Sequence, residues 1–343
     1  MRISVIGATG YTGAELLRIL AGHPEAEIVH ITSESSTGSR IADLYPHLSG
    51  IYKQELESMQ QLDDIIADSE LLFIGLPHGH AFNICPALNS ATRAIDLGAD
   101  YRFKNPAVYE KWYKLKHADD KTRAVYGLCE LYRNEIKTAK VVANPGCYVT
   151  ASILALAPLL KEHLIDSGGI IIDAKSGATG AGRALALGMH FSEHFDNFRP
   201  YGVANHRHTP EIEQAYSELA GQNVVISFTP HLLPMDRGIQ VTCYANLVPG
   251  SGENDIAAAF ERMYGDEYFI RLLGRGAYPA VKAVRGSNYV DIGWELDPRT
   301  GRVLVMSTLD NLVKGASGQA VQNMNIMFGW PENLGLKQVP LYP

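Results

Sequence analysis

The chain has 343 residues, of which 46% are hydrophobic and 20% charged, and its formal net charge is −7. Two domains are expected at this length, because single hydrophobic cores stop growing beyond about 250–300 residues. The acidic balance, with no basic block or stripe, argues against a general nucleic-acid or membrane-surface binder. The N-terminus lacks the features of a signal peptide and no run of about 18 apolar residues occurs, so we expect a soluble, cytoplasmic protein.

A glycine turn follows the first apolar run of the chain. Residues 3–6 predict a strand, and residues 14–20 are apolar at helical spacing. In a strand–turn–helix unit, glycines let the backbone approach a diphosphate, whose charge then lies at the positive end of the helix. The spacing G-x-x-G-x-x-G is weak evidence by itself, but its position ahead of a second strand strengthens it. We predict a dinucleotide site, with a structural turn as the alternative, formed by Gly7, Thr9, Gly10, Tyr11, Thr12 and Gly13.

The loop after the second predicted strand, residues 26–31, bears on the choice of cofactor. Hydroxyl groups and an arginine in this place accommodate the 2′-phosphate of NADP, whereas an acidic residue binds the ribose hydroxyl of NAD. Ser33, Ser36 and Arg40 therefore favour NADP(H) as the cofactor. Glu34 is the residue that favours NAD.

Further strands alternate with turns and helical patterns in the first half of the chain. Apolar runs at residues 71–75, 93–97 and 139–143 each end in a turn that contains glycine or proline. This alternation predicts an α/β fold with a Rossmann-type, doubly wound parallel sheet over residues 1–146. Ligands bind beyond the carboxyl ends of such strands, so Pro77, in the turn after residues 71–75, is a further candidate cofactor residue.

The second half of the chain is richer in strands. Runs at residues 169–176, 223–228, 238–245, 289–295 and 302–307 predict a mixed or antiparallel sheet, and residues 297–301 predict a hairpin turn. We therefore expect a second, α+β domain over residues 147–313, with catalytic, substrate-binding and oligomerisation roles. The C-terminal segment, residues 314–343, contains a helix that we expect to pack back on the first domain.

Cys147 follows a Pro-Gly bend between a strand pattern and a helix pattern. A helix N-terminus favours a thiolate over a thiol. The alternative is a small buried hydrophobic residue, which is common for a free cysteine. The other cysteines, at positions 85, 129 and 243, form no C-x-x-C pair, which favours a reducing compartment over a disulfide framework or a zinc site.

A nucleophilic cysteine needs a base or a cation nearby, and histidine is the usual choice. His206 and His208 flank Arg207 just before a predicted helix and would share one face of an extended segment. A third metal ligand is lacking nearby, so a metal site is not expected. Spacing does not decide which histidine is the acid/base; we predict His208 for that role and a substrate-orienting role for His206.

Residues 175–183 form a second loop rich in glycine, hydroxyl groups and cations. Such a loop binds phosphate through its amide groups, or is a flexible connection.

Six segments together resemble the N-acetyl-γ-glutamyl-phosphate reductase family, in the family's order and over nearly the whole chain. Asn-Pro-Gly-Cys-Tyr at 144–148 and His-Arg-His-Thr-Pro-Glu at 206–211 are the specific segments. The others are residues 7–15, 76–79, 96–102 and 311–320. The glycine loop and the cysteine turn taken by themselves also fit aspartate-semialdehyde and glyceraldehyde-3-phosphate dehydrogenases.

The resemblance implies NADPH-dependent reduction of an acyl phosphate to an aldehyde in arginine biosynthesis, with a thioester on Cys147 as intermediate. It also implies a dimer or tetramer that acts on small molecules. From the acidic charge balance we expect no nucleic-acid or membrane partner. The nicotinamide end would be bound by Asn311 and Gly315, with Ser176 and Gly177 also at the cofactor. The candidates for substrate binding are Arg102, Asn144, Ser176, Arg183 and His206.

Two alternatives stay open from the sequence. One is the same chemistry on another substrate, such as aspartyl phosphate or a carrier-bound aminoadipyl phosphate. The other is a non-catalytic protein that binds NADP as a sensor and performs no thiol chemistry.

Overall fold

The computed structural model describes residues 1–119 and 121–342, and the chain forms two compact units. The first unit contains residues 1–145 and 316–337, and the second contains residues 146–315 and the C-terminal segment from Gln338. The chain thus passes from the first unit to the second within the turn that precedes Cys147. The predicted division placed residue 146 in the first domain, and it placed residues 314–315 and 338–343 with the C-terminal helix. Pro343 lies outside the described residues.

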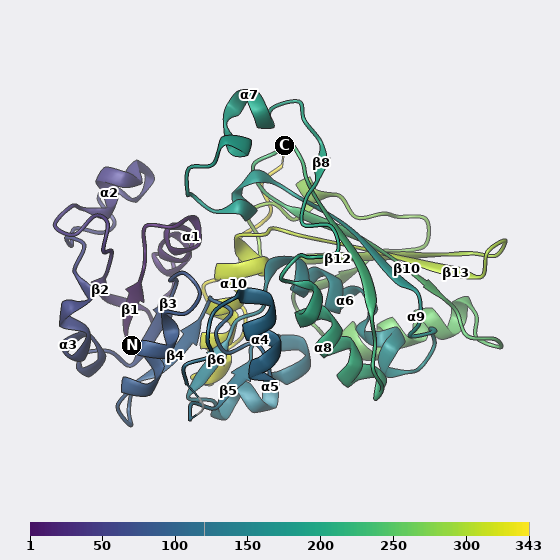
Figure 1. Ribbon diagram of the computed structural model, residues 1–343, viewed down its shortest axis with the longest axis horizontal. Helices are drawn as coiled ribbons and strands as arrows, with labels where there is room; N and C mark the ends of the chain where they lie inside the picture. Colours follow the sequence, from purple (N-terminus) through teal and green to yellow (C-terminus); the bar gives the residue numbers. More distant parts are fainter. Residues whose placement is uncertain (120, 343) are drawn as a thin grey trace. The chain divides into compact units, whose positions relative to one another are not determined.

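The first unit is built on a parallel sheet with the strand order β2-β1-β3-β4-β6-β5 (Figure 1). Each neighbouring pair of strands is parallel. The strands are β1 (Arg2–Ile6), β2 (Glu27–Ile31), β3 (Leu71–Ile74), β4 (Arg93–Asp96), β5 (Ala124–Tyr126) and β6 (Val141–Ala143). Their side chains are mostly buried on both faces, which is why these runs are continuously apolar in the sequence.

Helices and short 3₁₀ turns connect these strands. The C-terminal helix α10 packs against α1, α5 and β4, so residues far apart in sequence share one core. The helices of this unit are α1 (Tyr11–Leu20), α2 (Ile41–Leu44), α3 (Leu62–Ala67), α4 (Pro106–Tyr113), α5 (Cys129–Thr138) and α10 (Gly318–Met327). The 3₁₀ turns are η1 (Pro46–Leu48), η2 (Met59–Gln61), η3 (Ala81–Asn83) and η4 (Cys85–Ala87).

The second unit is built on a mixed sheet with the order β11-β12-β13-β10-β7-β9-β8. β7 and β9 are parallel, as are β11 and β12, and the other pairs are antiparallel. The strands are β7 (Ile170–Ser176), β8 (Arg199–Pro200), β9 (Ile226–Leu232), β10 (Ile239–Asn246), β11 (Ile270–Leu272), β12 (Val290–Asp297) and β13 (Arg302–Leu309). The predicted fold class, a Rossmann-type parallel sheet plus an α+β domain with a mixed sheet, is confirmed.

One face of the mixed sheet is covered by helices. α6 packs on β10 and β13, α8 packs on α6 and β9, and α9 packs on α6; Figure 1 shows all three helices on the same side of these strands. The helices are α6 (Cys147–Lys161), α7 (Phe191–His194), α8 (Thr209–Ala220) and α9 (Glu253–Tyr264). Short turns are η5 (Ala178–Ala181), η6 (Leu187–Met189), η7 (Val281–Ala283) and the π-helical η8 (Val313–Ser317), where the chain returns to the first unit.

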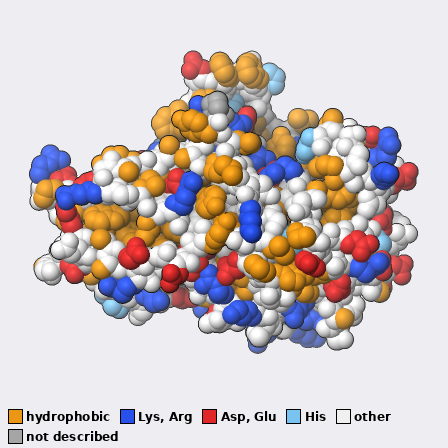
Figure 2. Space-filling view, turned by 180° about the vertical axis from the view of Figure 1, so that it is seen from behind, with side chains coloured by type: hydrophobic (Ala, Val, Ile, Leu, Met, Phe, Trp, Pro, Cys, Tyr) orange, Lys and Arg blue, Asp and Glu red, His pale blue; other side chains and the backbone are white. Residues whose placement is uncertain are grey.

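The other face of the mixed sheet is only partly covered. Along β10, buried Val241 and Cys243 alternate with half-exposed Thr242 and Tyr244. Exposed apolar side chains also gather in the segment that contains α7, which is visible at the top of Figure 2. In the described part of the chain, every helix is too short or too polar to cross a membrane.

Candidate active site

Asn144 belongs to the first unit's part of the cysteine turn, and three hydrogen bonds hold it. Its backbone N–H donates to the carbonyl of Asp96 (2.8 Å), and its side-chain Nδ2 donates to the carbonyl of Ala316 (3.1 Å). Its Oδ1 accepts from Nδ2 of Asn323 (3.1 Å). Only 1% of Asn144 is exposed. These contacts fix the backbone at Asn144, two residues before Gly146.

Arg102, predicted to bind an anionic substrate, is buried in the same network. Its Nε donates to the carbonyl of Asn144 (2.7 Å), and one of its terminal nitrogens donates to the carbonyl of Leu97 (3.0 Å). The buried carboxyl of Asp96 has a pKa raised to about 7, chiefly by burial and next by Asp100, while Arg102 acts in the opposite direction. The guanidinium therefore braces two backbone segments around a buried carboxyl.

Cys147 is the first residue of α6, and Gly146 is its N-cap with extended backbone. Cys147 is partly exposed, whereas Cys85, Cys129 and Cys243 are buried. Burial raises the pKa of the Cys243 thiol to about 12 and also raises the pKa of Cys85, so these two thiols stay protonated at neutral pH. Cys147 is instead a thiol at a helix N-terminus, where the helix dipole favours the thiolate.

Glycine is required on both sides of this cysteine. A Cβ at Gly315 would lie 2.9 Å from Cβ of Cys147, and a Cβ at Gly146 would lie 2.5 Å from Nε2 of His208. The first contact gives Gly315, predicted at the cofactor, a packing role within the second unit. The second contact places the His208 imidazole against the residue that precedes the thiol.

His206 lies beside His208 in a cluster of rings. The two imidazole centroids are 4.8 Å apart, and both rings contact Tyr148 edge-on. Nδ1 of His206 accepts the backbone N–H of His208 (3.1 Å). Burial, and then the charge of Arg207, lower the pKa of His206 to about 4. His206 is therefore neutral at neutral pH, with its proton on Nε2.

Two tyrosines complete this cluster. The hydroxyl of Tyr201 donates to that of Tyr148 (3.3 Å), which in turn donates to the carbonyl of His231 (3.1 Å). Burial raises the pKa of both hydroxyls, that of Tyr201 to about 12. Both tyrosines thus remain hydrogen-bond donors at neutral pH. Tyr148 belongs to the cysteine motif, but nothing in the sequence pattern indicates its contact with the histidines.

The predicted glycine-hydroxyl loop packs closely against the segment before β10. The Ser176 side chain is buried and donates to the carbonyl of Gly177 (2.9 Å), and a Cβ at Gly177 would meet the backbone of Asp236 at 2.7 Å. Asn311 joins this loop, because its Nδ2 donates to Thr179 (2.9 Å) and its Oδ1 accepts from the backbone of Gly238 (2.7 Å). Arg183, later in the loop, is exposed.

The glycine turn of the first unit borders a cavity of about 780 Å³. Gly7 and Gly13 allow close approach, since a Cβ would lie 2.7 Å from the carbonyl of Gly75 and 2.6 Å from the backbone of Ala8, respectively. A Cβ at Gly10, the N-cap of α1, would meet nothing within 4 Å. The turn therefore leaves open space at a helix N-terminus, which fits the diphosphate of a dinucleotide.

The lining of this cavity contains part of the predicted cofactor set. Gly7, Thr9, Gly10, Ser33 and Pro77 line it, whereas Tyr11, Thr12, Gly13, Ser36 and Arg40 are outside the lining. Other lining residues, which the sequence did not indicate, come from several separate segments. They include Met59, Leu62, Leu76, His80, Asn83 and Ile84.

The polar side chains of the loop after β2 differ in their hydrogen-bond and ion-pair partners. The hydroxyl of Ser33 bonds that of Thr9 (3.1 Å), and Oε1 of Glu34 accepts the backbone N–H of Met59 (2.6 Å). Arg40 is exposed and pairs with Asp43 at 3.3 Å. Among residues 1–119 and 121–342, no group of three or more His, Cys, Asp or Glu could hold a metal ion.

Comparison with known proteins identifies the family of this chain. Two family models match consecutive parts of the chain: "Semialdehyde dehydrogenase, NAD binding domain" over residues 2–139 and "Semialdehyde dehydrogenase, dimerisation domain" over residues 147–311. An N-acetyl-γ-glutamyl-phosphate reductase from Pelotomaculum thermopropionicum is 54% identical over 100% of this chain and 99% of its own. One from Geobacter sulfurreducens is 50% identical over 100% of both chains.

The chain belongs to the N-acetyl-γ-glutamyl-phosphate reductase family. The resemblance predicted from the six sequence segments is thereby confirmed. This reductase-family chain is an oxidoreductase of the semialdehyde dehydrogenase type, and its first unit is a nicotinamide-dinucleotide-binding domain.

Solved structures with low sequence identity share the reductase fold. Aspartate semialdehyde dehydrogenase II from Vibrio cholerae aligns with a TM-score of 0.72 at 15% identity, over 96% of this chain and 98% of that chain. Aspartate semialdehyde dehydrogenase from Francisella tularensis aligns with a TM-score of 0.69 at 14% identity, over 96% and 100%. The architecture is thus preserved where most side chains have changed.

Proposed function

We propose that this chain catalyses the NADPH-dependent reduction of N-acetyl-γ-glutamyl phosphate to N-acetylglutamate semialdehyde and phosphate in arginine biosynthesis. The observation that carries the proposal is the position of Cys147. Cys147 is a partly exposed residue at the start of α6, and His208 packs against the preceding residue. Full-length relatives with this name, about half identical to the chain, support the choice of substrate.

In the first step the Cys147 thiolate attacks the acyl carbon of the acyl phosphate. The carbon–sulfur bond forms as the carbon–oxygen bond to phosphate breaks, so the products are a thioester on Cys147 and inorganic phosphate. The helix N-terminus favours the anionic sulfur before attack. Covalent catalysis of this kind divides one difficult reduction into two easier steps.

In the second step the thioester is reduced and the aldehyde is released. NADPH, when bound to the first unit, supplies the hydride. The tetrahedral oxyanion on Cys147 then collapses, the carbon–sulfur bond breaks, and the thiolate is regenerated with the aldehyde as product. We assign His208 as the group that holds and moves the proton at the reacting oxygen.

The environment of His206 supports this division of roles between the histidines. Its pKa of about 4 makes it a weak base near neutral pH, whereas its neutral Nε2–H remains a donor. We therefore propose that His206 orients the substrate by hydrogen bonding, and that His208 performs the acid/base work.

Anion binding is assigned to groups that differ in burial. Arg183 is an exposed cation in the loop after β7, and we propose that it binds the substrate's phosphate or carboxylate. Ser176 and Asn144 are retained as candidate substrate contacts. Arg102 is buried with donors on two carbonyls, which favours support of the cysteine turn over direct contact with an anion.

We propose NADP(H) rather than NAD(H) as the cofactor. Ser33 and Ser35 provide hydroxyl groups at the cavity, and the Glu34 carboxyl there accepts the Met59 amide. Arg40 pairs with Asp43 outside the lining, so its contact with a 2′-phosphate would require a different side-chain rotamer. Tyr11, Thr12 and Gly13 in the glycine turn and Ser36 in the loop after β2 remain candidate cofactor contacts. Gly177, Asn311 and Gly315 in the second unit also remain candidate cofactor contacts.

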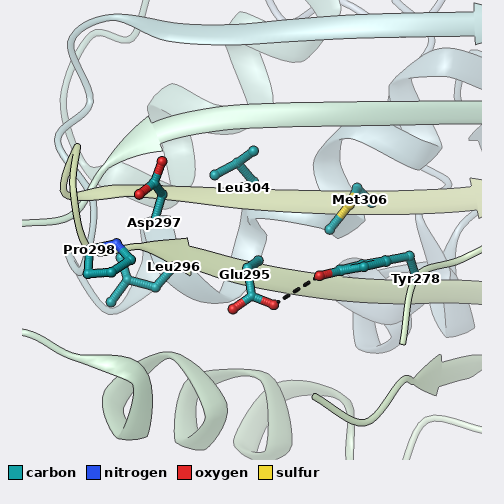
Figure 3. A pocket seen from close by; sticks show the side chains of 7 residues that line it. All are labelled: Tyr278, Glu295, Leu296, Asp297, Pro298, Leu304 and Met306. Atoms are coloured by element: carbon teal, nitrogen blue, oxygen red, sulfur yellow. Dashed lines mark hydrogen bonds between the residues drawn. The ribbon is translucent and has the colours of Figure 1, made fainter. Parts of the chain in front are cut away.

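Oligomerisation through the second unit is also proposed, as a dimer or tetramer. The side chains of Leu185, Leu187, Phe191, Phe195 and Phe198 are between 59% and 104% exposed, an unusual run for a surface in water. The partly covered sheet face carries an apolar-lined hollow of about 470 Å³ over β12 and β13, where Tyr278 and Glu295 point toward each other (Figure 3). Sedimentation velocity of the purified chain tests this association.

The cytoplasm is the proposed location, because the cysteines are thiols and such thiols persist in a reducing compartment.

The decisive experiment is phosphate-dependent NADP reduction with N-acetylglutamate semialdehyde, repeated with Cys147→Ser. We expect turnover by the parent and its near-complete loss in the variant. Turnover with aspartate semialdehyde instead would favour a different acyl phosphate. NADP binding without turnover of either aldehyde would favour a sensor, and full activity of Cys147→Ser would exclude the thioester.

A further inference from the structure

Glu211 is a fully buried acidic residue in the first turn of α8. Its exposed fraction is 0%, and its Oε1 accepts the backbone N–H of Gly146 at 3.1 Å. Gly146 is the N-cap of α6, directly before Cys147. A carboxyl from one helix thus binds the backbone amide at the start of the helix that bears the nucleophile.

The position of Glu211 suits this contact. Acidic side chains are favoured in the first turn of a helix, where free amide groups carry partial positive charge. The amide of Gly146 would otherwise be a buried donor, and buried backbone donors are nearly always paired. The hydrogen bond joins residues that are 65 positions apart in sequence, so it connects two separate segments of the second unit.

The same turn of α8 also presents a histidine to the same residue. His208 is the N-cap of α8, three residues before Glu211, and its Nε2 lies against Gly146. One short segment therefore contacts Gly146 twice, once through a ring nitrogen and once through a carboxyl oxygen. Any movement of α8 relative to Gly146 would therefore change the position of the imidazole relative to the thiol.

We propose that Glu211 is a positioning residue. Through its hydrogen bond to the Gly146 amide, it fixes the position of the Cys147 thiol relative to the His208 imidazole. This inference rests on the proposed function, in which Cys147 is the nucleophile and His208 the acid/base. Glu211 itself touches neither the reacting sulfur nor the substrate in this role.

A purely structural role predicts a different outcome. If Glu211 only stabilised the packing of α8 on α6, its loss would lower the resistance to urea and leave the chemistry of the folded protein unchanged. A positioning role predicts that the folded protein loses kcat and changes the reactivity of its thiol, because a displacement of about 1 Å can cost on the order of 100-fold in rate.

The test compares Glu211→Ala, Glu211→Gln and the control Glu213→Ala. Glu213 is on the same helix and accepts a backbone amide from Ile226 in β9, away from the cysteine turn. Two quantities are measured on each folded variant: kcat and KM for N-acetylglutamate semialdehyde, and the rate of Cys147 alkylation by iodoacetamide between pH 6 and 9, followed by mass spectrometry. The titratable groups around the turn, which include Tyr148, Tyr201, His206 and His208, are unchanged in all variants.

We expect Glu211→Ala to lower kcat by about 10- to 100-fold with little change in KM, and to alter the pH profile of alkylation. Glu211→Gln should recover most of the rate, because its amide oxygen can accept the same bond. Glu213→Ala should match the parent in both measurements. Parent-like kcat and alkylation in Glu211→Ala, or equal losses in Glu211→Ala and Glu211→Gln, would overturn the positioning role.

The alkylation measurement separates this inference from the proposed function, since it needs no substrate. A parent without turnover but with an altered alkylation profile in Glu211→Ala would refute the proposed activity and retain the positioning role. If Glu211→Ala does not fold, Glu211→Asp takes its place, because it keeps the carboxyl and retracts it by one methylene. Parent-like behaviour of a folded Glu211→Asp would then count against the proposal.

Discussion

Nε2 of His208 lies 2.5 Å from the position that a Cβ would take on Gly146. The absence of a side chain at Gly146 is therefore what allows the imidazole to approach the residue that precedes Cys147. Gly146 has φ of −68°, a value that any residue adopts, so the requirement for glycine is one of space and not of backbone conformation.

Gly146→Ala is expected to displace the His208 ring or the cysteine turn. Because the backbone tolerates alanine, the protein should fold, and kcat should fall by about 10- to 100-fold with KM little changed. Steady-state kinetics with N-acetylglutamate semialdehyde measure this. Gly252→Ala is the matched control, since a Cβ there meets nothing within 4 Å. Equal activity of both variants would show that His208 has no role that depends on its position.

The low pKa of His206 predicts a dependence of stability on pH. The folded-state pKa of about 4 is below the ordinary value of 6.5, so the unfolded chain binds more protons between these values. The stabilisation is present above pH 6.5 and is lost as the pH falls toward 4. We expect the free energy of unfolding to fall by about 2 kcal/mol more in the parent than in His206→Gln between pH 7 and pH 4.5.

Urea titrations at several pH values check this difference. Burial also lowers the pKa of His23 in the first unit, so the parent loses stability on acidification for a second reason. The comparison with His206→Gln removes that contribution, because His23 is the same in both proteins. Parallel pH profiles for the two proteins would contradict a neutral, half-buried His206.

Arg102→Leu distinguishes support of the turn from binding of an anion. The variant leaves the carbonyls of Leu97 and Asn144 without their donor, and removes the cation near buried Asp96. We expect a loss of about 2–4 kcal/mol of stability together with reduced kcat. A rise in KM at unchanged stability would instead indicate direct contact with substrate. Arg299→Leu is a control for loss of a surface ion pair, for which we expect little change in stability.

Glu34→Gln tests the cofactor preference. Glu34 lines the first unit's cavity, so its negative charge opposes a 2′-phosphate bound nearby. Removal of the charge should raise the ratio of kcat/KM for NADP to that for NAD by about fivefold, as expected for one charge pair near a protein surface. Kinetics with both cofactors measure the ratio. A decrease would indicate that Glu34 accepts a hydrogen bond from the bound nucleotide.

The sequence was sufficient to predict the fold class and the family. Strand runs of four to eight residues, the glycine turn and the change to long β-rich runs are local patterns. Local patterns reflect which faces of a strand or helix are buried. Cys147 was also identifiable, because a Pro-Gly bend before a helical run predicts a residue at a helix N-terminus.

The tertiary structure decided which polar residues support the site and how. Arg102 and Asn144 bond backbone groups, Gly315 makes room for Cys147, and Glu211 binds the Gly146 amide. The three hydrogen bonds join residues that are 42 to 172 positions apart in the sequence. No periodicity or spacing in the sequence therefore reveals them. A buried polar side chain takes its role from the donor or acceptor that folding places beside it, and that partner exists only once distant segments have packed together.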